Sequence, residues 1–329
     1  MTLPPDLPTS ALSFSRRYQD EKACAAQLAA LRWPEGFRCR RCEGREAWQL
    51  ESRPRVFECR SCHAQNSVTA GTVMHRSKVS LQEWFWAAWA LSQDKRGVSA
   101  LQLSKQLGRR YETVWHLLHK LRAALAEDFS AFPLHGVVEV DEAYIGGKTS
   151  PRKGGRSLSD HRRSLVVCAV ERRVPKEENH PGIRGNGVIA GAAALVALPA
   201  ASEKELVGFL KRSCGPGTTI RSDGWASYNG SVEQGLKHDK NIVLDPKLAS
   251  EILPIVHTMF ANLRSWLNGT FHGVSRTWLP RYLQEFRWRF NRRHREKHLW
   301  AYLLRRTMKK PWVQTVDLED VEPQVQLAA

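Results

Sequence analysis

Two pairs of cysteines constrain the fold of this chain more than any other feature of its sequence. Cys39 and Cys42 form one CxxC knuckle, and Cys59 and Cys62 form a second one after sixteen intervening residues. This spacing is typical of a tetrahedral four-thiolate zinc site in which a β-hairpin joins the knuckles. Because so small a segment has no core of its own, metal binding would supply its folding free energy. We therefore expect a zinc ribbon over residues 36–75, with these four cysteines as structural Zn²⁺ ligands.

The context of the cysteines argues against other chemistries. Cys59, Cys62 and His63 also match a haem-attachment motif, but that chemistry requires export, and residues 1–20 lack a secretory signal pattern. Seven cysteines are an odd number, which disfavours a disulfide scaffold. We therefore expect His63 to be a loop residue, and the protein to be cytoplasmic and associated with the nucleoid.

Charge and hydropathy narrow the class of protein. The 329 residues include 50 Lys and Arg against 33 Asp and Glu, which leaves a net charge of +17, and 42% are hydrophobic. The chain is therefore globular, and its positive charge predicts a polyanionic partner, of which nucleic acid is the first candidate. A basic enzyme without such a partner is the alternative. The longest apolar run, residues 188–201, is shorter than the roughly 20 residues of a membrane span, so we expect no membrane association.

Composition divides the chain into five parts. We expect a helical lead-in over residues 1–35, the zinc ribbon over 36–75, DNA-binding helices over 80–127, a catalytic domain over 136–310, and a tail over 311–329. The expected fold class is accordingly a multidomain α+β protein.

Residues 80–127 carry the pattern of a helix-turn-helix. A capped helix is followed by a short helix over 100–107, a turn at Gly108 and a longer helix over 111–126. In such a motif the second helix enters the DNA major groove with its N-terminal residues. The residues that we expect to contact DNA there are Arg109, Arg110, Thr113, Trp115 and His116. A helical linker whose charges form a solvated face is the alternative.

From residue 136 onward the apolar pattern has a period of two, which indicates strands. Three strands precede a helix that begins after Ser202, and a fourth strand ends at Asp223. Three antiparallel strands, a crossover helix and a strand that returns beside the first one are the order of a ribonuclease-H-like α/β domain. This order would place Asp141, in the first strand, next to Asp223. Such a pair is costly to bury unless a cation neutralises it, and it suits a two-Mg²⁺ site for phosphoryl transfer. A turn or capping role for each aspartate is the alternative.

Four segments resemble the motifs of one family of enzymes. They are VDEAYIGGK at 140–148, SDGWASY at 222–228, HTMFANLRSWLNGTFHGVS at 257–275 and YLQEFRWRFNRR at 282–293. Together they resemble insertion-sequence transposases of the ISXO-like group, which are DDE-superfamily enzymes with an N-terminal zinc ribbon. The resemblance extends over about residues 15–305. It implies a ribonuclease-H-like domain that cleaves transposon ends and joins them to target DNA with Mg²⁺.

The resemblance also implies roles for individual residues. The catalytic positions carry over onto Asp141, Asp223 and Asn262, with Asp141 bridging two magnesium ions and each of the others binding one. Arg264 stands where many relatives have lysine. Arg264 and His272 could bind phosphate or polarise the leaving 3′-oxygen, while packing or capping is the alternative for His272. Glu285 would be the third ligand if Asn262 is not.

Residues 287–310 contain ten Lys and Arg and one acid, Glu296. With tryptophans interleaved, this composition suits a DNA phosphate track that includes Arg292 and Arg293, and a solvated basic helix is the alternative.

These observations predict a DNA transposase that binds the terminal inverted repeats of an insertion sequence, cleaves its ends and transfers the strands. The expected partners are transposon-end and target DNA and further copies of this chain in a synaptic complex. A catalytically inactive DNA-binding regulator, or a ribonuclease-H-fold nuclease without strand transfer, are the alternatives.

Overall fold

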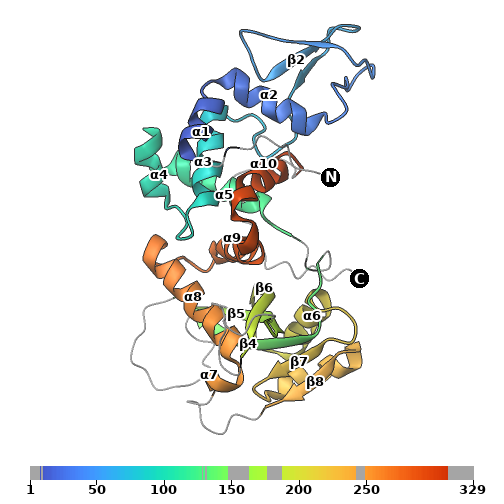
Figure 1. Ribbon diagram of the computed structural model, residues 1–329, viewed down its shortest axis with the longest axis vertical. Helices are drawn as coiled ribbons and strands as arrows, with labels where there is room; N and C mark the ends of the chain where they lie inside the picture. Colours follow the sequence, from blue (N-terminus) through green and yellow to red (C-terminus); the bar gives the residue numbers. More distant parts are fainter. Residues whose placement is uncertain are drawn as a thin grey trace. The chain divides into compact units, whose positions relative to one another are not determined.

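A computed structural model describes residues 8, 10–127, 129, 132–146, 163–175, 187–241 and 249–309 of the chain. The predicted tail over 311–329, and Gly147 and Lys148 of the first motif, lie outside these residues. The chain forms two compact units (Figure 1). The first ends at Leu125 and is joined again by the chain from His294 onward, and the second comprises Ala126–Arg293.

The first unit is built from helices around a cluster of aromatic rings. Its helices are α1 (Ala11–Arg17), α2 (Glu21–Arg32), α3 (Leu81–Gln93), α4 (Ala100–Leu107), α5 (Tyr111–Ala124), the 3₁₀ segment η4 (Arg293–His298) and α10 (Leu299–Lys309). Trp300 of α10 is 2% exposed, and its ring lies 5.1 Å from that of Tyr18 and 5.8 Å from that of Phe85. The predicted catalytic domain over 136–310 therefore does not coincide with the second unit, because α10 is part of the first core.

The helix boundaries follow from their capping residues. Ser80 and Glu83 form a capping box at α3, and the side chain of Ser99 accepts from Gln102 at α4. Gly108 ends α4 with a φ of 61°, a left-handed conformation that glycine adopts without strain. The predicted short helix, glycine turn and longer helix are therefore present.

The cysteine segment forms a small antiparallel sheet in the order β1-β2-β3. Its strands are β1 (Ala47–Gln49), β2 (Val56–Cys59) and β3 (Gln65–Ser67). The predicted hairpin corresponds to β1 and β2, whereas β3 was not predicted. Trp33, just after α2, packs its ring 4.9 Å from Phe37 and 5.2 Å from Phe57, so the ribbon is attached to the helical part of the unit.

The second unit contains a five-stranded sheet in the order β6-β5-β4-β7-β8. The strands are β4 (Val137–Ile145), β5 (Ser164–Arg173), β6 (Ile189–Leu198), β7 (Thr219–Ser222) and β8 (Lys237–Lys240). β4, β5 and β6 pair antiparallel, whereas β7 runs parallel to both β4 and β8. The predicted order of the first four strands is confirmed, and β8 was not predicted.

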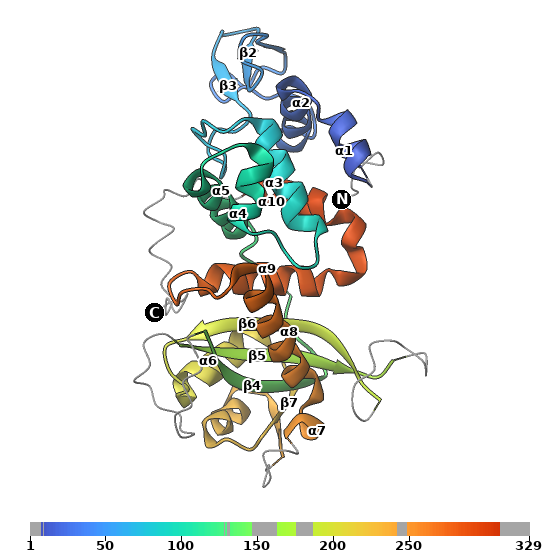
Figure 2. The same cartoon turned by 90° about the vertical axis from the view of Figure 1, so that its left-hand side faces the viewer.

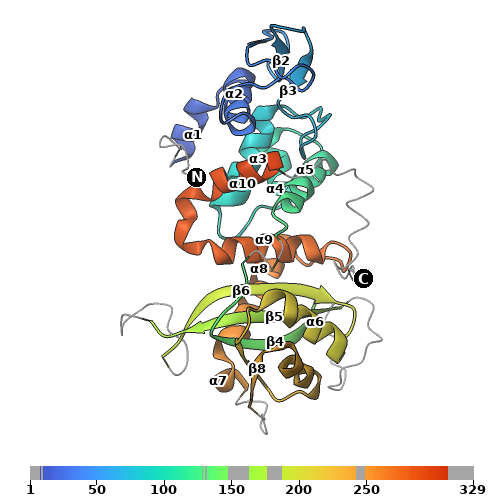
Figure 3. The same ribbon diagram turned by 90° about the vertical axis from the view of Figure 1, so that its right-hand side faces the viewer.

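Helices cover both faces of this sheet (Figures 2 and 3). α6 (Glu203–Ser213) and the 3₁₀ segment η2 (Ala226–Gln234) lie on one face, while α8 (Pro254–Phe271) lies across β4 and β5 on the other, preceded by α7 (Ala249–Ile252). α9 (Leu279–Asn291) lies against β6.

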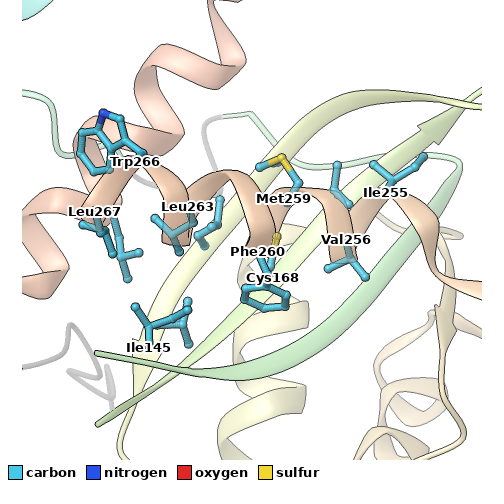
Figure 4. Close-up of a cluster of buried hydrophobic side chains, with 14 of the residues drawn as sticks. Ile145, Cys168, Ile255, Val256, Met259, Phe260, Leu263, Trp266 and Leu267 are labelled. Atoms are coloured by element: carbon cyan, nitrogen blue, oxygen red, sulfur yellow. The ribbon is translucent and has the colours of Figure 1, made fainter. Parts of the chain in front are cut away.

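Alternate residues of β5 point into the two cores that these helices form. Val166, Cys168 and Val170 pack with α8, whereas Leu165 and Val167 pack with α6. Figure 4 shows Cys168 beneath the apolar side of α8. None of the helices among the described residues is both long enough and apolar enough to span a bilayer.

A buried glutamate attaches the start of α8 to the sheet. Glu139 of β4 is 0% exposed, and its Oε2 accepts from the amides of Ile255 at 2.8 Å and Val256 at 3.1 Å. Its Oε1 accepts from Nη1 of Arg172 at 3.1 Å. Burial raises the pKa of Glu139, while the two amides and Arg172 oppose that rise. A carboxylate at a helix N-terminus is favourable, so this contact fixes where α8 crosses β4.

We expect Glu139→Ala to lower the free energy of unfolding by about 3 kcal/mol, because two buried amides and the Arg172 guanidinium lose their acceptor. Glu139→Gln retains one acceptor oxygen and should cost less. Urea denaturation followed by circular dichroism measures both, with the exposed Glu233→Ala as control. A loss below about 1 kcal/mol for Glu139→Ala would show that α8 is held by its apolar face alone.

Candidate active site and metal centre

The four cysteines of the two knuckles converge on one point. Their sulfur atoms all lie within 4.8 Å of one another, with Cys39 and Cys62 separated by 3.6 Å and Cys42 and Cys59 by 3.5 Å. Four sulfurs about 2.3 Å from one zinc ion would lie about 3.8 Å apart, so the cluster has the dimensions of a tetrahedral site. The predicted four-cysteine cluster is therefore present.

The four thiols of the cluster influence one another. Amide groups that donate to Cys39, first that of Arg41, lower the pKa of this thiol to about 6. The amide of Gly44 lowers the pKa of Cys42, but the sulfurs of Cys62 and Cys59 raise it, to about 12, so all four thiolates require a cation between them. Gly44 has no side chain, and a Cβ there would lie 3.1 Å from the sulfur of Cys59. His63 stands apart, since its ring is exposed and lies 3.5 Å from Glu58, as expected of a loop residue.

We expect elemental analysis of the purified protein to return about one zinc per chain, because the cluster offers four ligands to a single ion. The double variant Cys42→Ala with Cys59→Ala should lose the zinc and the structure of the ribbon, since metal binding supplies its folding free energy. Cys24→Ala, which changes a buried cysteine outside the cluster, should retain the metal. Full zinc retention in the double variant would contradict this assignment.

Asp141, within β4, and Asp223, directly after β7, occupy corresponding positions of two neighbouring strands. The parallel pairing of β4 and β7 aligns Val137 with Thr219 and ends with Glu139 opposite Arg221. Each aspartate is two residues beyond that last pair, so the strands deliver both carboxylates to the same level. β4 and β7 are neighbours as predicted, and Asp141 lies within β4, whereas Asp223 follows directly after the last residue of β7.

A buried tyrosine links the elements that carry these aspartates. Tyr228 of η2 is 0% exposed, and its hydroxyl donates to Oε2 of Glu142 at 2.6 Å. Burial raises the pKa of Tyr228 well above its usual value, and the charges of Glu142, Asp141 and Asp223 add to the rise. This hydroxyl lies with Glu142 on the face of the sheet that α6 covers, whereas Asp141, the preceding residue of β4, points to the α8 face. Asp223 is further oriented by the amide of Trp225, which donates to its Oδ1 at 3.0 Å.

α8 brings a histidine to this centre. Nε2 of His257 lies 3.6 Å from Oδ2 of Asp141. Burial and then the charge of Arg264 lower the pKa of His257, while Asp223 opposes the fall. This lowered pKa favours the neutral imidazole. The sequence contained a usable signal, since His257 and Arg264 are seven residues apart and so lie on one side of the helix.

The other residues predicted on α8 lie elsewhere. Asn262 is exposed, and its position five residues after His257 places it about 140° away around the helix axis. His272 caps the C-terminus of α8 with a φ of 54° and is exposed. It lies about 22 Å along the axis from His257, because each residue rises 1.5 Å. The structure thus brings Asp141, Asp223 and His257 together, with the charge of Arg264 nearby.

Glu285, the predicted substitute ligand, has a different environment. It is fully buried in α9, where its Oε1 accepts from Nε of Arg289 at 3.2 Å. α9 lies against β6, which β5 separates from the strand of Asp141.

Within the described residues, the zinc cluster is the one set of three or more Cys, His, Asp or Glu side chains whose ligand atoms all lie within 4.8 Å of one another.

The residues predicted to contact DNA divide by exposure. Arg110, at the N-cap of α5, and Thr113 are exposed. Trp115 and His116 are half-buried, and the ring of Trp115 lies 4.0 Å from that of buried His119.

The three remaining arginines of the DNA prediction make contacts within their own units. Arg109 bonds Glu83 of α3 at 2.5 Å and 3.2 Å. Arg292 pairs with Glu127, and Arg293 donates to backbone oxygens, including that of Gly191 at 3.1 Å.

Comparison with known proteins adds family information to this geometry. Residues 133–291 match the model of the ISXO2-like transposase domain, and residues 19–65 match that of the transposase zinc-ribbon domain. A protein described as an uncharacterised protein in transposable element ISH50 of Halobacterium salinarum is 26% identical over 217 residues, which cover 65% of this chain and 71% of that protein. The two matched ranges include the carboxylate centre and all four clustered cysteines.

Proposed function

Because this chain belongs to the ISXO2-like transposases and carries their zinc ribbon, we propose that it binds the terminal inverted repeats of an insertion sequence, cleaves the ends and transfers the strands. The observation that supports the proposal is the parallel pairing of β4 with β7, whose register leads from Glu139 and Arg221 to Asp141 and Asp223 two residues later. The sheet order supports a ribonuclease-H-like domain, since three antiparallel strands and a crossover helix precede the strand that returns beside the first.

The carboxylate centre suits hard divalent cations. Asp141 and Asp223 present acidic oxygens at one level of the sheet, and their mutual repulsion is relieved when a cation lies between them. These two residues would hold magnesium, which supplies charge neutralisation at the attacking and leaving oxygens of an in-line phosphoryl transfer. Tyr228 keeps Glu142 and the Asp223 turn in place through its hydrogen bond.

Two residues of α8 compete for the third position of the centre. The family resemblance favours Asn262, whose amide oxygen is a suitable ligand for magnesium. The geometry favours His257, which lies 3.6 Å from Asp141. We propose that His257 acts at the centre as a neutral imidazole and that Arg264, on the same side of α8, contacts DNA phosphate.

The exposed start of α5 supports DNA recognition by the helix-turn-helix. Arg110 would contact phosphate and Thr113 would face base edges, while Arg109 would position α5 through Glu83. Joining two transposon ends requires both in one complex, so we propose that the protein acts as a homo-oligomer on chromosomal DNA in the cytoplasm.

We expect Asp141→Asn and Asp223→Asn each to abolish nicking and joining of transposon ends while leaving end binding nearly intact, because only the metal site is lost. The double variant should be no worse than either single variant, since residues that act as one unit are not additive. A strand-transfer assay with the element's own ends measures this, and Asp94→Asn makes the same change away from the centre.

The unfolding temperature provides a readout that does not depend on activity. Mg²⁺ should raise it in the wild type and not in the two aspartate variants, because a ligand stabilises only the state that binds it. End binding without nicking by the wild type would indicate a DNA-binding regulator, and nicking without joining would indicate a nuclease. Either result would refute the proposed strand transfer.

We expect His257→Ala to slow strand transfer at least about tenfold, equivalent to about 1.4 kcal/mol, and to raise the Mg²⁺ requirement. Asn262→Ala should have a smaller effect, because its side chain lies on the other flank of α8. The measurement is strand-transfer rate against Mg²⁺ concentration for both variants. The reverse order of effects would assign the third position to Asn262.

A further inference from the structure

The first unit contains a cavity of about 860 Å³ between the end of α2, the first cysteine knuckle, the loop at residues 70–72 and α10. Its lining includes the charged residues Arg32, Arg38, Glu43, Arg40, Arg305 and Lys309. We name it the ribbon–α10 cavity. It is separate from α5 and from the carboxylate centre, whose residues are absent from its lining.

The charges of the ribbon–α10 cavity are strongly unbalanced. Against five Arg and Lys side chains, the lining carries one carboxylate, that of Glu43, which pairs with Arg38 at the exposed rim, and the thiol of Cys39. Burial lowers the pKa of Arg32, and the positive charge of Arg40 lowers it further. Crowded cations of this kind repel one another until an anion lies between them. The lining therefore has the charge pattern of an anion-binding site.

The fold brings these cations together from separate segments of the chain. Nη1 of Arg32 donates to the backbone oxygen of Val68 at 2.9 Å, which ties the end of α2 to the segment after β3. Arg40 lies between the zinc-ligand positions of the first knuckle, and its amide donates to the side chain of buried Asn66 at 3.1 Å. Arg305 and Lys309 are four residues apart and so project from one side of α10. Residues distant in sequence thus form one basic surface.

The remainder of the lining is largely apolar. It includes Trp33, Trp300, Leu304 and Met308. A free phosphate ion would use only the cations. A nucleic-acid backbone presents phosphates joined by deoxyribose sugars, and proteins contact both parts when they position a duplex. The combination of basic and apolar lining therefore matches a stretch of DNA backbone better than a single ion.

We propose that the ribbon–α10 cavity binds the phosphate backbone of transposon-end DNA, as a second contact besides α5. The proposal rests on the proposed transposase function. Because it concerns phosphates and sugars, this contact would strengthen binding to all DNA sequences alike, while the helix-turn-helix would select the inverted repeat. Zinc would support DNA binding through the knuckle that holds Arg40.

The test is a salt titration of DNA binding with the full-length protein. We expect Arg40→Gln with Lys309→Gln to weaken binding to the inverted-repeat duplex and to an unrelated duplex by the same factor. The slope of log affinity against log salt should become shallower by about 1.8, since each lost phosphate contact contributes about 0.9. The matched control is Arg41→Gln, which removes an exposed arginine of the same knuckle outside the lining.

Two measurements make the result decisive. Zinc content and circular dichroism of the double variant should equal those of the wild type, so that a change in slope reports lost phosphate contacts. An unchanged slope would overturn the cavity proposal, and so would an equal change in Arg41→Gln. If the wild type still joined transposon ends in that case, the transposase function would stand. A wild type that bound neither duplex would instead refute the proposed function itself.

Discussion

The parallel pairing of β4 with β7 is the constraint on which the second unit depends, because it brings the negative charges of Asp141 and Asp223 to corresponding positions of neighbouring strands. Asp141 and Asp223 are held at one level by the backbone pairing of β4 and β7, not by contacts between their side chains. Glu142, the next residue of β4, points to the other face of the sheet, where the hydroxyl of buried Tyr228 donates to it. The arrangement of the two aspartates raises the free energy of the folded state unless a cation binds. The hydrogen bonds of the sheet and the apolar core on each of its faces offset this unfavourable electrostatic free energy.

The same strand also determines which helix reaches the centre. Glu139 stands two residues before Asp141 and therefore points to the same face of β4. Its carboxylate accepts from the first amides of α8, so the helix begins at a fixed point above the strand. His257 follows one residue after the second of these amides and lies against Asp141. Glu139, a structural carboxylate, and Asp141, a candidate catalytic one, thus lie on the same strand. Glu139 fixes the start of α8, and α8 brings His257 to Asp141.

The sequence predicted regular elements well where local chemistry determined them. The caps at Ser80 and Ser99, the turn at Gly108 and the apolar periodicity of the central strands all correspond to the structure. The short strands β3 and β8 were missed. Each has three or four residues, mostly polar, and is defined by backbone pairing to a neighbour. Periodicity carries no signal for such strands, because they bury almost no apolar surface of their own.

The residues of the candidate site likewise include some that the sequence could predict and some that it could not. The neighbourhood of Asp141 and Asp223 could be predicted because strand order determines it. The position of His257 could not, since it depends on where α8 crosses the sheet. The DNA phosphate track predicted over residues 287–310 was inferred from the number of Lys and Arg residues. That number does not show whether a guanidinium group faces solvent or bonds an acceptor within the protein. Arg292 pairs with Glu127, which is far away in sequence.

Net charge alone therefore does not locate the DNA-binding surface of this chain. Arg292 and Arg293 make internal contacts and the exposed Arg109 pairs with Glu83, so part of the surplus positive charge stabilises the two units. Cations that line a concave surface or lie at an exposed helix N-terminus are better candidates for DNA contacts. In the first unit such cations are found at the ribbon–α10 cavity and at the start of α5. Since the cavity is formed partly by a cysteine knuckle, the folding of the ribbon and the proposed binding of DNA backbone depend on one metal site. The zinc cluster would then serve recognition by holding the knuckle that carries Arg40, with its ligand Cys39 in the lining of the cavity.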